Sequence, residues 1–244
     1  MYFQFPAIGI IHSCFKEKFG IPRQPGLAPL AQARLELSPP YDDPAAVTGL
    51  ETCSHIWVQF VFHANSRASW KAKVRPPRLG GNKTLGVFAT RSPVRPAAIG
   101  LSVVKLERIE QRAGKLCLLL SGVDFLDGTP VLDIKPYIPY VDKVEGAFNH
   151  FAPAAPTLIG VTFTEQQLAF CASYQTRTAV DLKGLIQQIL QQDPRPQYQT
   201  PSVEKIYGMK LLDLDLRWRY QTDGNIALEE ILSIVEAPQP ASCS

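Results

Sequence analysis

One short segment, residues 124–140, concentrates the residue types that could carry out chemistry. It reads Asp-Phe-Leu-Asp-Gly-Thr-Pro-Val-Leu-Asp-Ile-Lys-Pro-Tyr-Ile-Pro-Tyr and holds three carboxylates, one lysine and two tyrosines. Proline fixes φ and removes a backbone donor, and Asp-Gly marks a tight turn, so we expect a rigid polar wall beside an apolar strand. The carboxylates of such a wall could accept protons, although a turn-capping role explains them equally well.

A second feature is the strongly basic segment from residue 65 to residue 115. It holds twelve Lys/Arg and two acids, a net charge of +10, whereas the whole chain of 244 residues carries +3. Several of its arginines lie beside prolines, as in Arg75-Pro-Pro-Arg78 and Arg91-Ser-Pro-Val-Arg95-Pro. Guanidinium groups on a stiff backbone suit bidentate phosphate contacts, so the segment predicts either a nucleic-acid partner or a plain solvated face.

The motifs of the common cofactor and metal sites do not occur in the sequence. There is no Gly-x-Gly-x-x-Gly, Walker lysine or nucleophile-elbow motif, and the histidines and cysteines lack metal-ligand spacing. We therefore expect no Rossmann domain and no metal. A run of eighteen apolar residues and a basic-then-apolar leader are also missing, so we expect a cytoplasmic protein without a membrane span.

The elements that must position these residues are mostly short strands. Apolar runs bounded by Gly/Pro loops predict strands at residues 5–15, 55–63, 85–89, 99–109, 116–123 and 131–134. Many short strands without long alternating helices indicate a β-barrel or sandwich.

The last third of the chain has a different pattern. An Ala/Pro-rich linker at 149–163 precedes two predicted helices, 164–174 and 181–192, and a predicted strand pair, 212–220 and 226–235. The predicted fold class is therefore mainly β, with a β-rich body over residues 1–150 and a small α+β domain over residues 151–244.

The predicted strand at 212–220 alternates strictly between apolar and charged residues. Its charged face carries two aspartates together with Arg217 and Arg219. A cross-paired solvent face is the simpler interpretation. The alternative is a surface that binds a nucleic-acid backbone with help from Arg195 and Tyr198, because arginine is a favoured phosphate ligand.

A set of motifs occurs along the chain in an order that resembles a known family. The motifs are Pro22-Arg-Gln-Pro-Gly26, His55-Ile-Trp-Val58 leading to Phe62-His63, Arg75-Pro-Pro-Arg78 with Gly80-Gly-Asn82, Gly86-Val-Phe-Ala-Thr-Arg-Ser-Pro93, Asp127-Gly-Thr-Pro-x-x-Asp-Ile-Lys-Pro-Tyr137, and Asp193-Pro-Arg-Pro-x-Tyr198 with Arg217-Trp-Arg219. On these motifs the chain resembles the TrmO, or TsaA-like, family of S-adenosylmethionine-dependent tRNA methyltransferases. The resemblance covers nearly the whole chain.

The resemblance implies a non-Rossmann methyltransferase domain built on a β-barrel and active as a homodimer. Family members transfer a methyl group from S-adenosylmethionine to N6 of threonylcarbamoyladenosine, which lies next to the anticodon of threonine tRNA. Carried over by motif, the cofactor site would comprise Pro22, Arg23, Gln24, His63, Ala64, Arg91, Leu101, Asp127, Gly128, Thr129 and Pro130.

Within that resemblance, further roles follow from the chemistry of the residues. The acceptor nitrogen belongs to a urea-like group and is weakly nucleophilic, so Asp127 and Asp133 are candidate proton acceptors. Tyr137 is a third catalytic candidate, able to stack on an extruded base. The residues expected to contact the anticodon stem-loop are Arg75, Arg78, Arg95, Lys135, Arg195, Tyr198, Arg217 and Arg219.

Two positions depart from the family pattern. Arg95-Pro-Ala-Ala-Ile-Gly100 stands where relatives have Arg-Pro-Asn-Pro-Ile-Gly, and Ala64 follows the histidine where relatives often have glutamine. The first departure motivates an alternative function, a non-catalytic RNA-binding module of the same fold. A barrel hydrolase acting through Asp127 and Asp133 is a third hypothesis.

Overall fold

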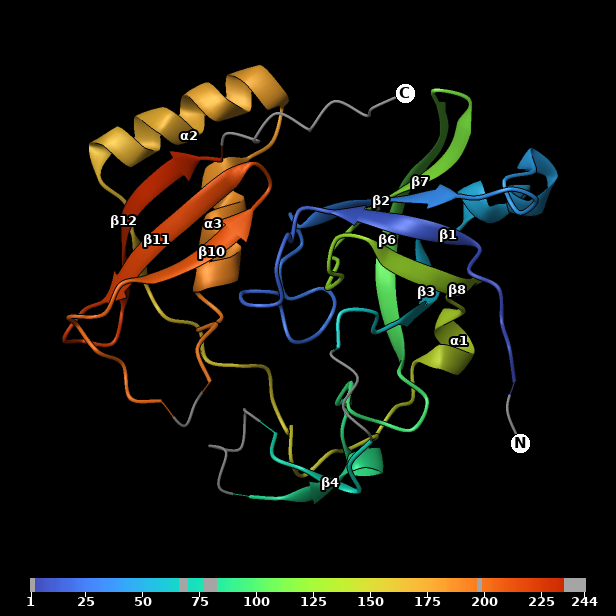
Figure 1. The fold of residues 1–244 in the computed structure, drawn as a ribbon, viewed down its shortest axis with the longest axis horizontal. Coiled ribbons are helices and arrows are strands. Elements are labelled where there is room, and N and C mark those ends of the chain that lie inside the picture. The colour runs from blue at the N-terminus through green and yellow to red at the C-terminus, as the bar shows by residue number, and fades with distance from the viewer. Residues whose placement is uncertain (1–2, 66–69, 77–82, 197–198, 235–244) are drawn as a thin grey trace, which may run out of the picture.

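The N-terminal part of the chain forms a closed β-barrel. The computed structural model describes residues 3–65, 70–76, 83–196 and 199–234. Six antiparallel strands close in the order β1-β2-β7-β6-β3-β8 (Figure 1). They are β1 (Gly9–Ser13), β2 (Gln32–Leu37), β3 (His55–Val61), β6 (Ile99–Arg112), β7 (Lys115–Ser121) and β8 (Thr129–Pro136). The predicted mainly β fold class with a barrel is confirmed.

Alternating apolar residues explain why these segments form a barrel. Along β3, Ile56, Val58 and Phe60 are buried, while the residues between them are more exposed. β2 repeats the pattern with Leu35 and Leu37. Because side chains alternate across a strand, one apolar set from each strand fills the interior and the other set faces outward.

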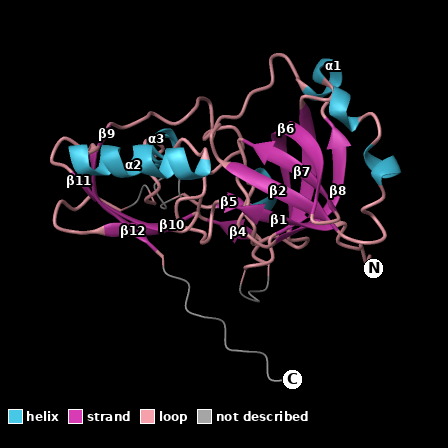
Figure 2. Ribbon diagram, turned by 90° about the horizontal axis from the view of Figure 1, so that it is seen from above, coloured by secondary structure: helices cyan, strands magenta, loops and turns pink. Residues whose placement is uncertain are grey.

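The C-terminal part of the chain packs two helices on a small sheet. The sheet order is β10-β11-β12-β9, with β9 parallel to β12. The elements are β9 (Val161–Thr162), α2 (Glu165–Thr178), α3 (Leu182–Leu190), β10 (Tyr207–Leu211), β11 (Leu214–Tyr220) and β12 (Ile226–Ser233). The view from above in Figure 2 shows α2 lying along this unit beside the barrel. A capping box between Thr164 and Gln167 fixes the start of α2.

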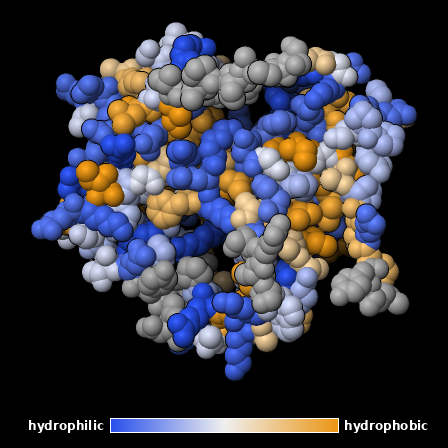
Figure 3. All heavy atoms as spheres, viewed as in Figure 1, coloured by the Kyte–Doolittle hydropathy of each residue, from blue (hydrophilic) through white to orange (hydrophobic). Residues whose placement is uncertain are grey.

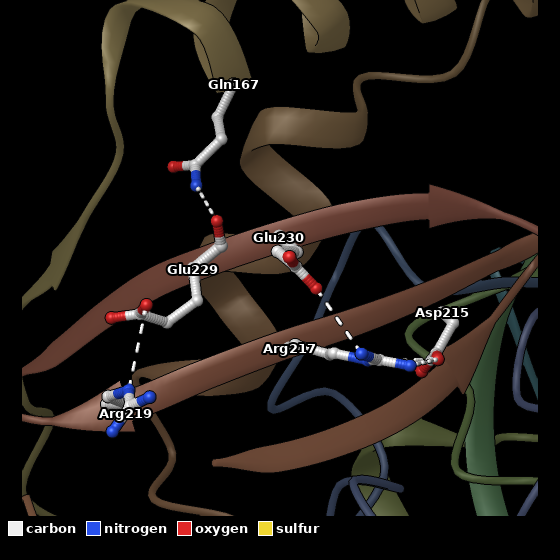
Figure 4. A network of polar contacts seen from close by, with 6 residues as sticks. All are labelled: Gln167, Asp215, Arg217, Arg219, Glu229 and Glu230. Carbon is white, nitrogen blue, oxygen red and sulfur yellow. Dashed lines mark hydrogen bonds and ion pairs between the residues drawn. The ribbon is translucent and has the colours of Figure 1, made fainter. Parts of the chain in front are cut away.

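The charged face of β11 is cross-paired with its neighbours. Arg217 lies 3.3 Å from Asp215 and 3.4 Å from Glu230, and Arg219 lies 3.7 Å from Glu229 (Figure 4). These contacts agree with the simpler interpretation of the alternating strand. The RNA-binding role of the two arginines stays a prediction.

Residues 14–30 join the two units. The Phe19 ring stacks on Trp218 of β11, with centroids 5.9 Å apart and planes 1° apart. Two glutamines of the α3 region bind the same segment, since Leu30 N donates to Gln188 Oε1 and Gln192 Nε2 donates to Leu27 O. The loop after β1 is therefore held by the barrel and the C-terminal unit together.

The structure corrects several predicted elements. The predicted strand at 85–89 is wrong beyond β5 (Leu85–Gly86), which pairs with β4 (Lys73–Val74), because Val87–Ala89 forms a 3-10 turn. Strands β2 and β10 were not predicted, although both alternate buried and exposed residues. The predicted linker at 149–163 contains β9. A short helix, α1 (Pro139–Asp142), begins at the end of the segment 124–140. The domain boundary after residue 150 stays a prediction.

Candidate functional site

A cavity of about 710 Å³ is built from strands and loops that are distant in sequence. Its walls come from the second half of β3, the first four residues of β6, and the turn between β7 and β8. Loops around residues 21–24 and 90–97 complete it. Its volume lies in the range of about 300–1,000 Å³ typical of small-molecule sites.

The charges around this cavity are strongly one-sided. Its described lining holds four Lys/Arg, one histidine and a single acid, which are Lys18, Arg23, Arg91, Arg95, His63 and Asp124. Such a wall favours ligands that carry carboxylate or phosphate groups. Asp124, the one acid of this lining, forms a subsite of opposite charge to the basic wall of the same cavity.

Polar contacts hold the two loops of the cavity against each other. The Arg91 guanidinium donates to Gln24 Oε1, and Arg95 Nη1 donates to Thr90 O at 3.2 Å. Arg23 Nη2 donates to the backbone oxygen of Arg195 at 2.8 Å, so this loop also contacts the C-terminal unit. The predicted cofactor residues Pro22, Arg23, Gln24, His63, Ala64, Arg91, Leu101 and Thr129 are all in the cavity lining.

Gly100 permits a close approach between β6 and the Phe60 ring. A Cβ atom at this position would lie 2.2 Å from Phe60 Cζ. The ring is held edge-to-face by Phe62 and Phe125, with centroids 5.1 and 5.0 Å away. This wall of the cavity therefore depends on a residue without a side chain.

Replacing Gly100 by alanine is expected to destabilise the barrel by about 1–3 kcal/mol, because overpacking shifts side chains and backbone. Urea unfolding followed by circular dichroism would measure the loss. Gly86→Ala is the matched control, since a Cβ atom at Gly86 meets nothing within 4 Å. Equal midpoints for the two variants would contradict the expected clash.

Asp124 is the acid of the cavity. It follows β7, and its Oδ1 is buried without a hydrogen-bond partner among the residues that the structure describes. Burial raises the pKa of this carboxyl to about 6, and the Ser102 hydroxyl and the Arg91 charge offset only part of that rise. A buried acceptor without a donor is costly, so the group is suited to a ligand that supplies one.

The predicted catalytic Asp127 has a different environment. Its Oδ1 accepts from Ser13 N at 2.7 Å, and its Oδ2 lies 2.8 Å from Lys16 Nζ. Gly128 completes the turn with a φ of 77°, which favours glycine. Neither residue nor Pro130 belongs to the cavity lining. These contacts anchor the turn on β1, and the cofactor and catalytic roles of the three residues stay predictions.

The other catalytic candidates lie on the outer part of β8 and beyond. Asp133 Oδ2 is paired with Lys135 Nζ at 2.6 Å. The Tyr137 ring packs 6.0 Å from Trp57, and only Trp57 reaches the cavity lining. The structure therefore does not bring Asp133 and Tyr137 together with the cofactor candidates, and their roles stay predictions.

The predicted RNA-binding residues are dispersed. Arg75 is exposed, while Arg195 is mostly buried between Asp193 and the Tyr220 ring. Arg78 and Tyr198 lie outside the described residues. The face drawn in Figure 3 is largely hydrophilic, with separate hydrophobic groups on both units.

Sequence reasoning assigned no role to several residues of the cavity wall, and three of them matter most for the chemistry. Trp57, Ser102 and Asp124 all line it. A signal existed for Asp124, because a carboxylate directly after an apolar strand is expected to be partly buried. No signal existed for Ser102, since only the β3–β6 pairing places it beside the turn that carries Asp124.

Neither a metal-ligand cluster nor a membrane-spanning helix occurs in the described part of the chain. The described residues contain no group of three or more His, Cys, Asp or Glu side chains placed to hold a metal ion. Among them there is also no helix with the length and apolar character needed to cross a membrane.

Comparisons with known proteins give consistent results. A family profile described as the tRNA-methyltransferase O N-terminal domain matches residues 10–143, and one described as the TrmO C-terminal domain matches residues 156–234. The tRNA (adenine(37)-N6)-methyltransferase of Escherichia coli is 43% identical over 91% of this chain and 95% of its own length.

Two proteins of Pseudomonas aeruginosa extend this likeness. The protein RcsF, whose name places it among S-adenosylmethionine-dependent methyltransferases, is 54% identical over 87% of this chain and 90% of its own. A crystal structure of TrmO from the same organism superposes with a TM-score of 0.80 at 43% identity, covering 96% of this chain and 99% of that one.

Proposed function

This chain belongs to the TrmO family of tRNA methyltransferases, and from that premise we propose that it methylates N6 of adenosine 37 in tRNA with S-adenosylmethionine as methyl donor. The more specific substrate that we propose is threonylcarbamoyladenosine in threonine tRNA. The observation that carries the proposal is a cavity whose described lining has an arginine-rich wall and a single acid, Asp124, with a buried Oδ1.

The described residues fit this methyl donor. The cavity is large enough for a nucleoside with an amino-acid arm. Arg91 and Arg23 are suited to the carboxylate of that arm, since arginine forms charge-assisted bonds with carboxylates. The unpartnered Oδ1 of Asp124 suits an N–H or O–H group. Apolar rings such as Phe60 and Trp57 would cover the base.

When bound, the donor supplies an electrophilic methyl group on a sulfonium. N6 of the acceptor forms a bond to the methyl carbon as the carbon–sulfur bond breaks, and the N6 proton is released. The contribution of this chain is to position the two reactants in line and to exclude water. The buried β3 and β6 residues of the cavity wall are rigid strand positions, which suits that task.

The surplus of basic side chains supports a modified, anionic base as acceptor. The methyl donor brings one carboxylate, and the threonyl group of threonylcarbamoyladenosine brings a second. Four Lys/Arg residues around the cavity are more than one carboxylate needs. An unmodified adenine would leave the second anion subsite empty.

The test is methylation of defined tRNA in vitro. Threonine tRNA with and without threonylcarbamoyl at position 37 would be incubated with the protein and S-adenosylmethionine, and its nucleosides analysed by mass spectrometry. We expect a methyl gain only on the modified tRNA. Equal methylation of both substrates would refute the specific substrate and leave the enzyme class intact. Binding of tRNA with neither cofactor binding nor methyl transfer would favour the non-catalytic RNA-binding module instead.

The basic segment around Arg75 supplies a prediction about tRNA binding. Replacing Arg75 and Arg78 by alanine is expected to lower the slope of log affinity against log salt by about 2, since each phosphate contact adds about 0.9. Filter binding at several salt concentrations would measure the slope. Lys105→Ala with Lys115→Ala is the matched control, because both lysines are paired with glutamates. Identical slopes for the two double variants would place the RNA elsewhere.

We also propose that the protein acts in the cytoplasm as a homodimer. Support for the dimer comes from large apolar side chains that follow β8 and are strongly exposed, including Tyr140 at 86% and Phe148 at 80%. A second copy would cover them. Light scattering would give the mass, and a Phe148→Asp variant is expected to shift it toward the monomer.

A further inference from the structure

Asp124 is a partly buried acid whose buried Oδ1 is not explained by contacts among the described residues. Within the part of the chain that the structure describes, its Oδ1 has no hydrogen-bond partner, whereas Asp127, three residues later, is bonded through both carboxylate oxygens. The residue is also the one acid of the described cavity lining. Buried carboxylates without partners reduce stability, so such a group is expected at a position where a ligand completes its contacts.

The polar groups that act on the Asp124 carboxyl are the Ser102 hydroxyl and the Arg91 guanidinium. The next residue, Phe125, is 1% exposed, and its ring packs edge-to-face against Phe60, which is 5% exposed. β6 contributes the Ser102 hydroxyl, and neither β3 nor β6 contributes a charged residue to the cavity lining. Arg91 is the charged side chain that lowers its pKa. The other charged or titratable lining residues are Lys18, Arg23, Arg95 and His63.

We propose that Asp124 is the acceptor for an N–H or O–H group of the bound methyl donor and that it binds this group in its ionised form. The inference rests on the proposed function. The donor molecule carries two groups of this kind, the α-ammonium of its amino-acid arm and the hydroxyls of its ribose. The basic wall takes the carboxylate of the arm, and Asp124 provides the complementary acidic subsite.

Calorimetric titration with S-adenosylhomocysteine tests the proposal without requiring activity. At about pH 7.5, Asp124→Asn is expected to weaken binding about 10- to 100-fold, as for loss of a bond to a charged acceptor. Binding to the unchanged protein is expected to weaken about tenfold between pH 7.5 and pH 5, because the carboxyl takes up a proton near pH 6. The variant should lack that dependence. Glu107→Gln is the control, a carboxylate bonded to Ser121 outside the cavity lining.

A truncated ligand identifies the bound group. 5′-Methylthioadenosine keeps the ribose and lacks the amino-acid arm. If Asp124→Asn weakens only S-adenosylhomocysteine, the α-ammonium is the partner; if it weakens both ligands, the ribose is. Equal affinities of variant and unchanged protein would overturn the proposal. A pH dependence that persists in the variant would also overturn it.

A second measurement uses the protein without ligand. The folded pKa of Asp124 lies above its usual value, so its contribution to stability is present at low pH and is lost as the pH rises through about 6. Asp124→Asn should therefore melt above the unchanged protein near pH 7.5, and the difference should shrink toward pH 4. A variant that melts lower at neutral pH would point to a structural role and overturn the proposal.

Ser102→Ala gives an independent variant of the same site. Because the Ser102 hydroxyl lowers the pKa of Asp124, its removal should move the midpoint of the pH dependence upward. An unchanged midpoint would contradict the proposal. Failure of the unchanged protein to bind S-adenosylhomocysteine at any pH would instead refute the proposed function.

Discussion

Replacing Arg91 by alanine is expected to weaken S-adenosylhomocysteine binding about 10- to 100-fold, an effect as large as that expected for Asp124→Asn. Arg91 lines the cavity, and its guanidinium donates to Gln24 Oε1, which restricts the orientation of a group suited to bidentate pairing with a carboxylate. The affinity of Arg91→Lys for S-adenosylhomocysteine should lie between that of the unchanged protein and that of Arg91→Ala. The lysine ammonium keeps the positive charge but lacks the planar guanidinium that binds a carboxylate through two hydrogen bonds.

The control for this prediction is Arg108→Ala on β6. Arg108 carries the same charge and lies 2.9 Å from Glu110, outside the cavity lining. Calorimetry of the three variants would separate loss of charge in general from loss of a ligand contact. If Arg91→Ala and Arg108→Ala bound equally well, the carboxylate subsite would have to be placed on another basic residue.

Replacing Trp218 by alanine is expected to cost about 3–5 kcal/mol of the free energy of unfolding. Trp218 is 0% exposed, and its ring packs on Phe19 and Tyr207, with centroids 5.9 and 6.2 Å away. The substitution therefore removes core packing of the C-terminal unit and its stack with the loop of the barrel. Aromatic pairs add about 0.5–1.5 kcal/mol beyond the buried area.

Urea unfolding followed by circular dichroism would measure this loss. Trp218→Phe keeps an aromatic ring and should lose much less. Trp70→Ala removes the same side chain from a position that is 53% exposed and should change stability by less than about 0.5 kcal/mol. A Trp218→Ala variant as stable as Trp70→Ala would show that the stack with Phe19 contributes little.

Much of the fold follows from local patterns in the sequence. The alternation in β3 and β11 and the N-terminal caps of α2 and α3 are local signals, and each led to an element near its observed position. Closure of the barrel cannot be read from local patterns, because it depends on strand pairs such as β1 with β8, which are far apart in the sequence. The short strands β4, β5 and β9 have two residues each, too few to show any period.

Site residues that belong to sequence motifs could be predicted, whereas contacts that depend on the tertiary fold could not. Arg91 and His63 were named from motifs, and both line the cavity. The sequence also predicts that the segment from residue 124 to residue 140 faces the ligand through Asp127; this role stays a prediction, and the structure shows the Asp127 carboxylate accepting from Ser13 N. Which carboxylate of a turn faces inward depends on the backbone donors nearby, and those donors belong to β1, more than a hundred residues earlier.

The loop formed by residues 14–30 can couple the binding of the methyl donor to the binding of tRNA. It contributes Arg23 to the cavity and Phe19 to the C-terminal unit, so its conformation belongs to both. Thermodynamic coupling between two binding sites is reciprocal. If RNA bound to the C-terminal unit stabilises the ligand-binding conformation of this loop, it raises the affinity for the methyl donor, and the donor raises the affinity for RNA by the same factor. Heterotropic cooperativity of this kind would appear as a cofactor affinity that depends on tRNA concentration, with no change in the cavity residues themselves.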